Sequence, residues 1–266
     1  MLLWTTFFTA LIVILTLMFL LWLLSLYLKD SSIVDIFWGF GFVVTGWLYY
    51  ALSPEGFQGR KLLIMLLVFI WGMRLTIHIY LRNRGEGEDY RYAQWREEAG
   101  SAWWWRSLFK VFLLQGLLMW IISAPILAAM ASPTPARFTV LDILGVVIWG
   151  IGFYFEAVGD WQLAQFKADP ANEGKVLRSG VWRYTRHPNY FGDAAQWWGY
   201  YAIAANTWLG AATVFSPILM TLLLIRVSGV ALLEKNLTET KPKYQDYVET
   251  TNAFFPWFPK ENQQEE

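Results

Sequence analysis

Residues 2–28 read LLWTTFFTALIVILTLMFLLWLLSLYL and contain no charged side chain. About 20 mainly apolar residues in a helix span the hydrocarbon core of a bilayer, so this stretch predicts a membrane-spanning helix. No basic segment precedes it and no small-residue cleavage site follows it, although a secretory signal peptide would have both. We therefore expect a helix that stays in the membrane.

Comparable apolar runs recur at roughly 33–51, 61–82, 108–131, 139–163, 190–205 and 209–233. The run at 190–205 is short and begins just after Pro188, a residue that suits the first turn of a helix. The chain of 266 residues is 56% hydrophobic and 16% charged, whereas about a quarter of the residues in a soluble domain are charged. We expect an all-α, polytopic membrane protein of about seven transmembrane helices, in a single domain over residues 1–266. A soluble helical protein with buried helices is the alternative.

Basic residues orient the expected bundle. On one side of the bundle, the only basic residues of the loops are Arg60, Lys61 and Arg137. The other side of the bundle carries Arg82, Arg84, Arg91, Arg96 and Arg106, then Lys167, Lys175, Arg178, Arg183 and Arg186, then Lys235, Lys241, Lys243 and Lys260 in the tail. The positive-inside rule places these basic segments and the C-terminus in the cytoplasm. Seven spans then place the N-terminus outside, in the inner membrane if the source is bacterial.

Composition excludes several classes of site. The chain has no cysteine and two histidines, so we expect no disulfide, no thiolate site and no histidine-rich metal site. The formal net charge is zero, so nothing points to nucleic acid as a partner. The sequence has neither a GxGxxG fingerprint after a strand nor a P-loop, and any nucleotide must therefore be held at helix ends and loops.

Polar side chains inside the expected spans are candidate functional groups, because burying them in lipid is costly. Asp35 lies in SIVDIFWG near the start of the second span, where it is either a catalytic group or a first-turn residue favoured by the helix dipole. Arg74 lies inside the third span, where a partner carboxylate or an anionic ligand is expected. Gln115 and Glu156 either take part in a site or bridge helices through hydrogen bonds. Asp160 lies one turn after Glu156, on the same face.

Residues 179–193, SGVWRYTRHPNYFGD, combine arginines, tyrosines and amide and carboxylate side chains at the start of an apolar run. Arginine suits phosphate groups, and aromatic rings can stack on a nicotinamide or adenine ring. Pro188 precedes a helix whose first amides can receive an anion, and Asn189 and Asp193 lie one turn apart there. The alternative is an interfacial anchor in which these side chains contact lipid headgroups.

Arg226 and Glu234 lie eight residues apart near the end of the last span. That spacing puts them on one helical face, where they could close a cofactor site from the tail side. They could equally be an ordinary snorkelling arginine and a solvated glutamate.

The segment RSGVWRYTRHPNYFGDAAQWWG, residues 178–199, resembles the C-terminal signature of membrane reductases of the steroid 5α-reductase type, and more closely that of their bacterial relatives. The resemblance spans most of the chain and is strongest over residues 150–258. It also includes VDIFWG at Val34–Gly39, WGMRL at Trp71–Leu75, EDYRY at Glu88–Tyr92 and VSGVALLEK at Val227–Lys235. It implies an oxidoreductase acting on CH–CH groups in lipid metabolism. NADPH would donate hydride to the activated carbon–carbon double bond of an apolar lipid or steroid-like enone that enters from the bilayer.

The resemblance also implies positions for the cofactor, on the cytoplasmic side. Asp160 resembles the aspartate of a helix-five cofactor motif, and Lys167 and Lys175 fall at basic positions. Asn189 and Asp193 match a pattern in which both polar side chains face the cofactor. The full expected set is Arg74, Asn83, Arg84, Gln115, Glu156, Asp160, Lys167, Lys175, Tyr184, Arg186, His187, Asn189, Tyr190, Asp193, Arg226 and Glu234. The surplus of cations favours NADPH over NADH.

The catalytic group is expected at Asp35, the counterpart of a glutamate that holds the substrate carbonyl in the steroid enzymes. Hydride addition builds negative charge on that carbonyl oxygen, and a protonated carboxyl group in an apolar site can stabilise it. The partner tyrosine of the steroid enzymes falls near Trp71, which cannot act as an acid. Glu156 stands at a family asparagine and Glu234 at or near a second family tyrosine. The substrate and the proton donor therefore stay open, as does the oligomeric state.

Two other readings stay open. The RHPNYFG core also resembles isoprenylcysteine carboxyl methyltransferases and related phospholipid methyltransferases, which bind S-adenosylmethionine with the same corner. Glu234 and Tyr244 partly satisfy their downstream pattern, whereas Asp160, the acidic residue after NYFG and the N-terminal motifs favour a reductase. The third reading is a lipid-binding or transport protein without catalysis, although no internal repeat supports a transporter built from inverted halves.

Overall fold

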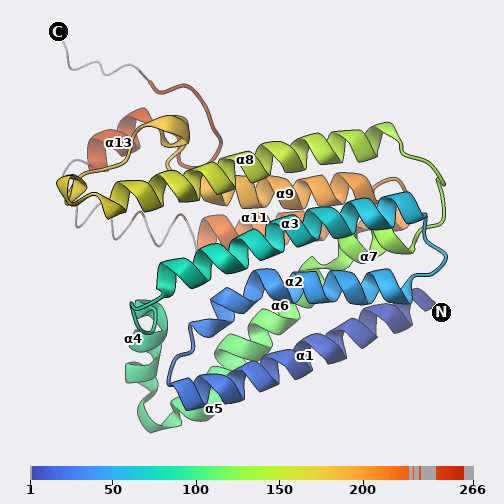
Figure 1. The fold of residues 1–266 in the computed structure, drawn as a ribbon, viewed down its shortest axis with the longest axis horizontal. Coiled ribbons are helices and arrows are strands. Elements are labelled where there is room, and N and C mark those ends of the chain that lie inside the picture. Colours follow the sequence, from blue (N-terminus) through green and yellow to red (C-terminus); the bar gives the residue numbers. More distant parts are fainter. Residues whose placement is uncertain (1, 228–229, 231–233, 235–243, 261–266) are drawn as a thin grey trace. The chain divides into compact units, whose positions relative to one another are not determined.

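The computed structural model describes residues 2–227, 230, 234 and 244–260, and all regular structure within these residues is helical (Figure 1). The chain divides into two compact units, Met1–Asp142 with Ala204–Ser216, and Ile143–Ile203 with Pro217–Glu266. We call them unit 1 and unit 2 and describe each by itself. The expectation of a single domain stays a prediction.

Unit 1 holds most of the described helices. They are α1 (Leu2–Leu28), α2 (Ile33–Leu52), α3 (Gln58–Asn83), α4 (Tyr90–Ala99), η1 (Gly100–Ala102), α5 (Trp103–Ser107), η2 (Leu108–Leu113), α6 (Leu114–Ile122), α7 (Ala124–Ala131), α10 (Trp208–Ala211) and η5 (Ala212–Val214).

Unit 2 is formed mainly by two long helices and the C-terminal segment. Its elements are α8 (Val140–Ala168), η3 (Pro170–Asn172), η4 (Gly180–Arg183), α9 (Pro188–Ala204), α11 (Phe215–Leu222), η6 (Leu223–Val227) and α13 (Tyr244–Thr250). The first residues of α8 and of α11 belong to unit 1.

Six helical runs in the described residues are long and apolar enough to cross a membrane. They are Leu3–Leu28, Ile33–Leu52, Gln58–Asn83, Tyr90–Ala131, Val140–Ala168 and Trp208–Arg226. This confirms the expectation of an all-α, multi-pass membrane protein. The remaining expected span coincides with α9, whose 17 residues give a helix about 26 Å long at 1.5 Å per residue. Part of the expected span at 209–233 lies outside the described residues, and the count of seven and the orientation stay predictions.

Large apolar side chains are exposed along these helices. Ile12 is 67% exposed, Leu66 56%, Phe109 61% and Ile143 62%. A protein in water rarely exposes so many large apolar side chains together, whereas a helix in a bilayer exposes them along its lipid-facing side. These surfaces indicate contact with membrane lipids.

Within unit 1, α2 and α3 lie side by side (Figure 1), and glycines lie at their closest contact. A Cβ atom on Gly72 would lie 2.6 Å from the carbonyl oxygen of Gly39, so only glycine allows the two backbones to approach this closely. Trp71 is fully buried beside this contact, and the centroids of its ring and the Phe42 ring are 5.6 Å apart. Trp71 thus contributes to helix packing in unit 1.

A buried ion pair joins the starts of α3 and α8. Arg60 Nε lies 2.8 Å from Asp142 Oδ1, and both side chains are 1% exposed. The guanidinium also donates to the backbone carbonyls of Pro135 and Arg137. The two carbonyls and Asp142 Oδ2 accept from Nη2 and offset part of the cost of burying the pair, whereas Nη1 has no partner among the described residues. Arg60 therefore has a structural role, because it links the first turn of α3 to the start of α8 and the segment before it.

Within unit 2, α8 and α9 lie side by side (Figure 1), and glycines at seven-residue spacing lie at their contact. A Cβ on Gly152 would lie 2.5 Å from the carbonyl oxygen of Gly192, and a Cβ on Gly145 would lie 2.7 Å from that of Gly199. Residues seven apart lie on one face of a helix, so both contacts belong to one continuous seam. Beside this seam, Glu156 and Asp160 of α8 face Gln196 and Asn189 of α9.

Candidate functional site

Polar side chains face each other where α8 meets α9. Asn189 Nδ2 donates to Asp160 Oδ1 at 3.0 Å, and Gln196 Nε2 donates to Glu156 Oε2 at 2.5 Å. Glu156 is 3% exposed, Asp160 and Asp193 are each 8% exposed, and Gln196 is fully buried. The structure thus brings together Glu156, Asp160 and Asn189, with Asp193 one turn after Asn189 on α9. We call these four residues and Gln196 the α8–α9 polar cluster.

Gln196 was not predicted as a site residue, although the sequence carries a signal for it. Positions 189, 193 and 196 are spaced by four and three residues, as on one face of a helix. The carboxamide oxygen of Gln196 is buried and has no hydrogen-bond donor among the described residues. A buried acceptor without a partner is costly, so this oxygen is available to a donor other than the described side chains.

The α8–α9 polar cluster consists mainly of hydrogen-bond acceptors. Carboxylate and carboxamide oxygens accept from hydroxyl and amide N–H groups and repel anions. Cations lie further along unit 2: Lys167 is exposed in the last turn of α8, and Lys175 is exposed in the loop after η3. Lys167 lies two helical turns beyond Asp160, an axial separation of about 10 Å. Unit 2 therefore carries an acceptor-rich region and a cationic region along one helix.

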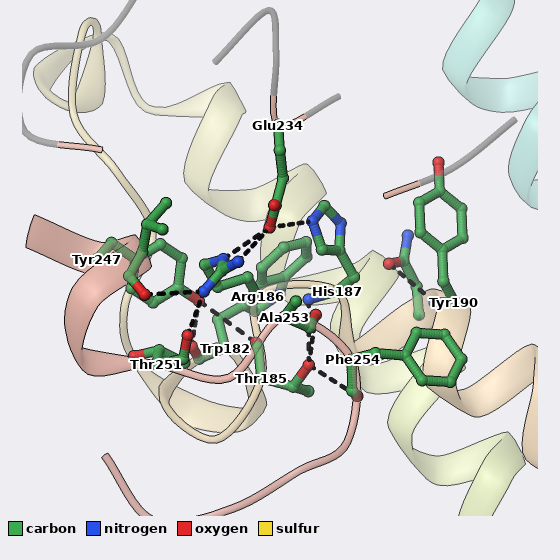
Figure 2. Close-up of polar contacts among 12 residues, drawn as sticks. Trp182, Thr185, Arg186, His187, Tyr190, Glu234, Tyr247, Thr251, Ala253 and Phe254 are labelled. Carbon is green, nitrogen blue, oxygen red and sulfur yellow. Dashed lines mark hydrogen bonds and ion pairs between the residues drawn. The ribbon is translucent and has the colours of Figure 1, made fainter. Parts of the chain in front are cut away.

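Arg186 holds the C-terminal segment onto η4 and the start of α9, and Figure 2 shows the contacts. Its Nε donates to Glu234 Oε1 at 2.7 Å, and its Nη1 donates to the backbone carbonyls of Val248, at 3.0 Å, and Thr251. The Arg186 backbone N–H donates to the carbonyl of Asn252 at 2.9 Å. Because these contacts use a guanidinium that is 7% exposed, Arg186 has a structural role, and its predicted contact with a cofactor stays a prediction.

Neighbouring side chains extend this clamp (Figure 2). The Thr185 hydroxyl donates to the carbonyls of Ala253 and Phe254, and the Tyr247 hydroxyl donates to the carbonyl of Trp182. These contacts join residues more than sixty positions apart. The segment 244–260 therefore belongs to the packed part of unit 2.

His187 and Glu234 meet beside Arg186. His187 Nε2 lies 3.2 Å from Glu234 Oε1, and the His187 ring stacks on Tyr190 with centroids 5.7 Å apart. Burial alone would raise the pKa of Glu234, but the hydrogen bonds from His187 and Arg186 outweigh it and hold that pKa below its usual value. Glu234 therefore contacts the RHP corner, whereas Arg226 is exposed in η6.

A second polar group, in unit 1, surrounds Asp35. The Tyr92 hydroxyl donates to Asp35 Oδ1 at 2.6 Å, and Arg91 Nη2 donates to Asp35 Oδ2 at 2.9 Å. Gln115 Nε2 donates to the Tyr92 hydroxyl oxygen at 3.2 Å. Asp89, the N-cap of α4, accepts from the Arg91 backbone N–H and from Arg91 Nε. We call Asp35, Arg91, Tyr92 and Gln115 the Asp35 cluster.

Asp35 lies at a helix start and has two hydrogen-bond donors. Ser32 is the N-cap of α2 and Asp35 lies in the first turn. Its side chain accepts from the Arg91 guanidinium and the Tyr92 phenol, and its catalytic role stays a prediction. The hydroxyl able to donate belongs to Tyr92, which is 3% exposed. Tyr92 was missed as a site residue, because the sequence does not show that the EDYRY segment folds back onto α2.

A separate ion pair fixes α4 to the turn before α2. Arg96 donates twice to Glu88 at 2.8 Å, and the Ser31 backbone N–H donates to Glu88 Oε1 at 2.6 Å. Burial opposes ionisation of Glu88, but the hydrogen bonds from Arg96 and Ser31 outweigh it and hold the pKa of Glu88 below its usual value. This contact positions α4, and with it Arg91 and Tyr92.

The remaining predicted residues lie in α3, at its C-terminal end and beside η4. Arg74 is half-buried in α3, and Asn83 accepts a hydrogen bond from Arg82 Nε at 3.0 Å at the end of that helix. Arg84 is the exposed C-cap of α3. Tyr184 packs against Phe258 with ring centroids 5.9 Å apart.

Comparison with known proteins identifies a family. The family model described as "Protein of unknown function (DUF1295)" matches residues 21–251. An uncharacterized protein of Schizosaccharomyces pombe is 26% identical over 275 aligned residues, which cover 89% of this chain and 75% of that protein. No solved structure matches the chain. The family match covers most of the chain, including the Asp35 cluster and the α8–α9 polar cluster. The protein therefore belongs to the DUF1295 family.

Proposed function

We propose that the protein is an NADPH-dependent membrane reductase that acts on the activated carbon–carbon double bond of an apolar lipid or steroid-like enone. The observation that carries the proposal is the partly buried contact between Asn189 and Asp160, with the buried Glu156 and Asp193 beside it. These are the positions at which the chain resembles cofactor residues of steroid 5α-reductase-type enzymes. Contacts between residues so far apart in sequence are not implied by the motifs alone.

The residues present suit the cofactor. The α8–α9 polar cluster offers buried acceptors, among them the Gln196 oxygen without a donor, for ribose hydroxyls and a nicotinamide N–H. The exposed Lys167 and Lys175 suit its phosphate groups. When bound, NADPH supplies the hydride, and the protein supplies binding and orientation.

Proton delivery is assigned to the Asp35 cluster. The substrate carbonyl becomes more negative during reduction, so a hydroxyl donor aimed at its oxygen lowers the barrier. Tyr92 holds that proton on its phenol oxygen. The Tyr92 hydroxyl is held by Asp35 Oδ1, and Arg91 pairs with Asp35 Oδ2. Gln115, by donating to the same phenol oxygen, stabilises the negative charge left there after transfer.

A methyltransferase remains a second candidate because of one contact. Glu234 meets the RHP corner through Arg186 and His187, and an acidic residue on the last helix beside this corner belongs to the S-adenosylmethionine pattern. Lipid binding without catalysis is the third candidate. Direct binding of the two cofactors distinguishes these readings.

The test uses the purified full chain in detergent micelles, with nicotinamide fluorescence as the probe of NADPH binding and S-adenosylmethionine as the rival ligand. Asn189→Ala should weaken NADPH binding roughly tenfold or more, because it removes the proposed cofactor contact of Asn189 and the hydrogen bond that positions Asp160. Asn252→Ala is the matched control, since the Asn252 residue is exposed and lies outside the cluster. Binding of S-adenosylmethionine in place of NADPH would refute the reductase.

A further inference from the structure

A groove with a volume of about 410 Å³ runs along α8 in unit 2. Its lining includes Tyr154, Phe155, Gln162, Gly180, Arg183 and Tyr184. Ligand pockets commonly have volumes of about 300–1,000 Å³. Of the described residues in the lining, only Tyr184 was expected to touch a cofactor. The groove is therefore largely separate from the residues of the proposed reductase site.

The groove is held open by contacts that fix the η4 segment to α8. Gly180 adopts a φ of +61°, and a Cβ at that position would overlap the Gln162 carboxamide. Gln162 Oε1 accepts from the Val181 backbone N–H at 3.1 Å, and Trp182 Nε1 donates to the Gly159 carbonyl at 3.0 Å. These contacts fix the position of the η4 segment on α8, so the groove is preformed within unit 2.

Polarity changes along the groove. Arg183 and Gln162 lie at one end, and Tyr154 and Phe155 lie about two helical turns, or some 11 Å, back along α8. These two aromatic residues fall inside the apolar run Val140–Ala168. None of the described residues that line the groove is a carboxylate. The groove thus suits an anionic group at Arg183 and a hydrocarbon chain beside Phe155.

Exposed aromatic side chains stand along the rim of the groove. Trp257 is 69% exposed, and Phe258, which packs against Tyr184, is 73% exposed. Phe255 is 68% exposed and contacts Phe191, which in turn contacts Phe155 in the groove. Tryptophan and other aromatic residues are enriched at the level of lipid headgroups. This end of unit 2 is therefore suited to the membrane–water interface.

We propose that the groove binds one glycerophospholipid with an anionic headgroup, taken from the surrounding leaflet. The phosphate lies at Arg183, and the first part of an acyl chain lies along Phe155. The lining has a cation and no acid at its polar end, an apolar wall inside the membrane run, and an interfacial aromatic rim. A free phosphate ion would use only the first of these features.

The test measures lipid retained by the purified full chain with native mass spectrometry, after adding phosphatidylglycerol or phosphatidylcholine to the detergent solution. Wild-type protein should bind phosphatidylglycerol about five- to tenfold more tightly than phosphatidylcholine, which is the scale of one cation near an anionic headgroup. Arg183→Gln should remove this preference. Arg178→Gln is the matched control, because Arg178 is exposed nearby and is not in the lining.

Each other outcome contradicts the proposal. Equal affinity for the two lipids, an unchanged preference in Arg183→Gln, or an equal loss in Arg178→Gln would show that the groove has no headgroup site. Release of the lipid by inorganic phosphate or by NADPH would assign the Arg183 end to a free anion or to the cofactor. Thermal unfolding of both variants must match wild type for the comparison to stand.

Discussion

Two hydrogen bonds meet at the hydroxyl of Tyr92, one donated to Asp35 and one received from Gln115. A buried phenol in this position is oriented by its partners, whereas a solvated one samples many directions. The same side chain also lies under the Arg91 guanidinium, 5.5 Å from the ring centroid. At the residue scale, the proposed proton transfer to the substrate depends mainly on the Tyr92 hydroxyl, with Asp35 as its hydrogen-bond partner.

Tyr92→Phe removes the hydroxyl and leaves the ring. Because a positioned proton donor contributes about 10²–10⁴-fold to rate, turnover should fall by about a hundredfold or more while NADPH affinity stays unchanged. The measurement follows NADPH oxidation with an apolar cyclic enone dissolved in the micelle. Tyr90→Phe, at a neighbouring residue that is 55% exposed, should behave as wild type. A loss of twofold or less in Tyr92→Phe would leave Tyr92 with a packing role only.

Glu88 makes stability depend on pH. Its pKa is lowered in the folded protein by Arg96 and Ser31, against the effect of burial. Its stabilising contribution is therefore complete above the unfolded pKa of about 4.3 and is lost as the pH falls through the lower folded pKa. Glu88→Gln should lower the melting temperature at neutral pH, and the difference from wild type should shrink at acidic pH.

The control for Glu88 is Glu86→Gln, an exposed glutamate two residues earlier. Thermal unfolding followed by tryptophan fluorescence at several pH values separates the two variants. A Glu88→Gln deficit that stays constant from neutral pH down to pH values below the folded pKa would mean that its ion pair with Arg96 does not contribute.

At the scale of helices, the seam between α8 and α9 places the polar cluster. Gly152 and Gly192 allow the backbones to touch, and this approach brings Glu156 within reach of Gln196 and Asp160 within reach of Asn189. The seven-residue spacing of the glycines can be read in the sequence. The sequence does not show which helix these glycines contact, because a stripe of small residues allows close packing against any helix.

Gly152→Ala places a Cβ against the Gly192 carbonyl oxygen, at 2.5 Å before any adjustment. Overpacking of this kind costs about 1–3 kcal/mol, so the melting temperature in detergent should fall by several degrees. Gly150→Ala provides a matched control on the same helix, since its Cβ would meet no atom within 4 Å. Equal melting temperatures for the two variants would contradict the described seam.

At the scale of the whole molecule, the number of crossings decides the orientation of the termini. Six described runs are long enough to span, and α9 is a helix of 17 residues, near the lower end of the usual range of about 17–25 residues for a span. If α9 crosses, the two termini lie on opposite sides. If it does not, they lie on the same side.

We predict opposite sides, with the C-terminus in the cytoplasm, because the basic residues gather on the segments that this arrangement puts inside. Reporters active only in the cytoplasm or only outside it, fused in turn to each terminus, test this arrangement. Termini on the same side would remove α9 from the spans and leave it as a helix that does not cross.

The sequence by itself determined the membrane class and the helix positions, because long apolar runs and their spacing are local properties of the chain. Motifs also indicated Asp160, Asn189 and Asp193 as candidates. The tertiary structure alone decided the partners: Tyr92 with Asp35 across 57 positions, Gln196 with Glu156 across 40, and Arg186 with the tail. A hydrogen bond needs atoms about 3 Å apart in a fixed direction. Helix periodicity shows which side of a helix is polar, and only the packing of helices shows what that side meets.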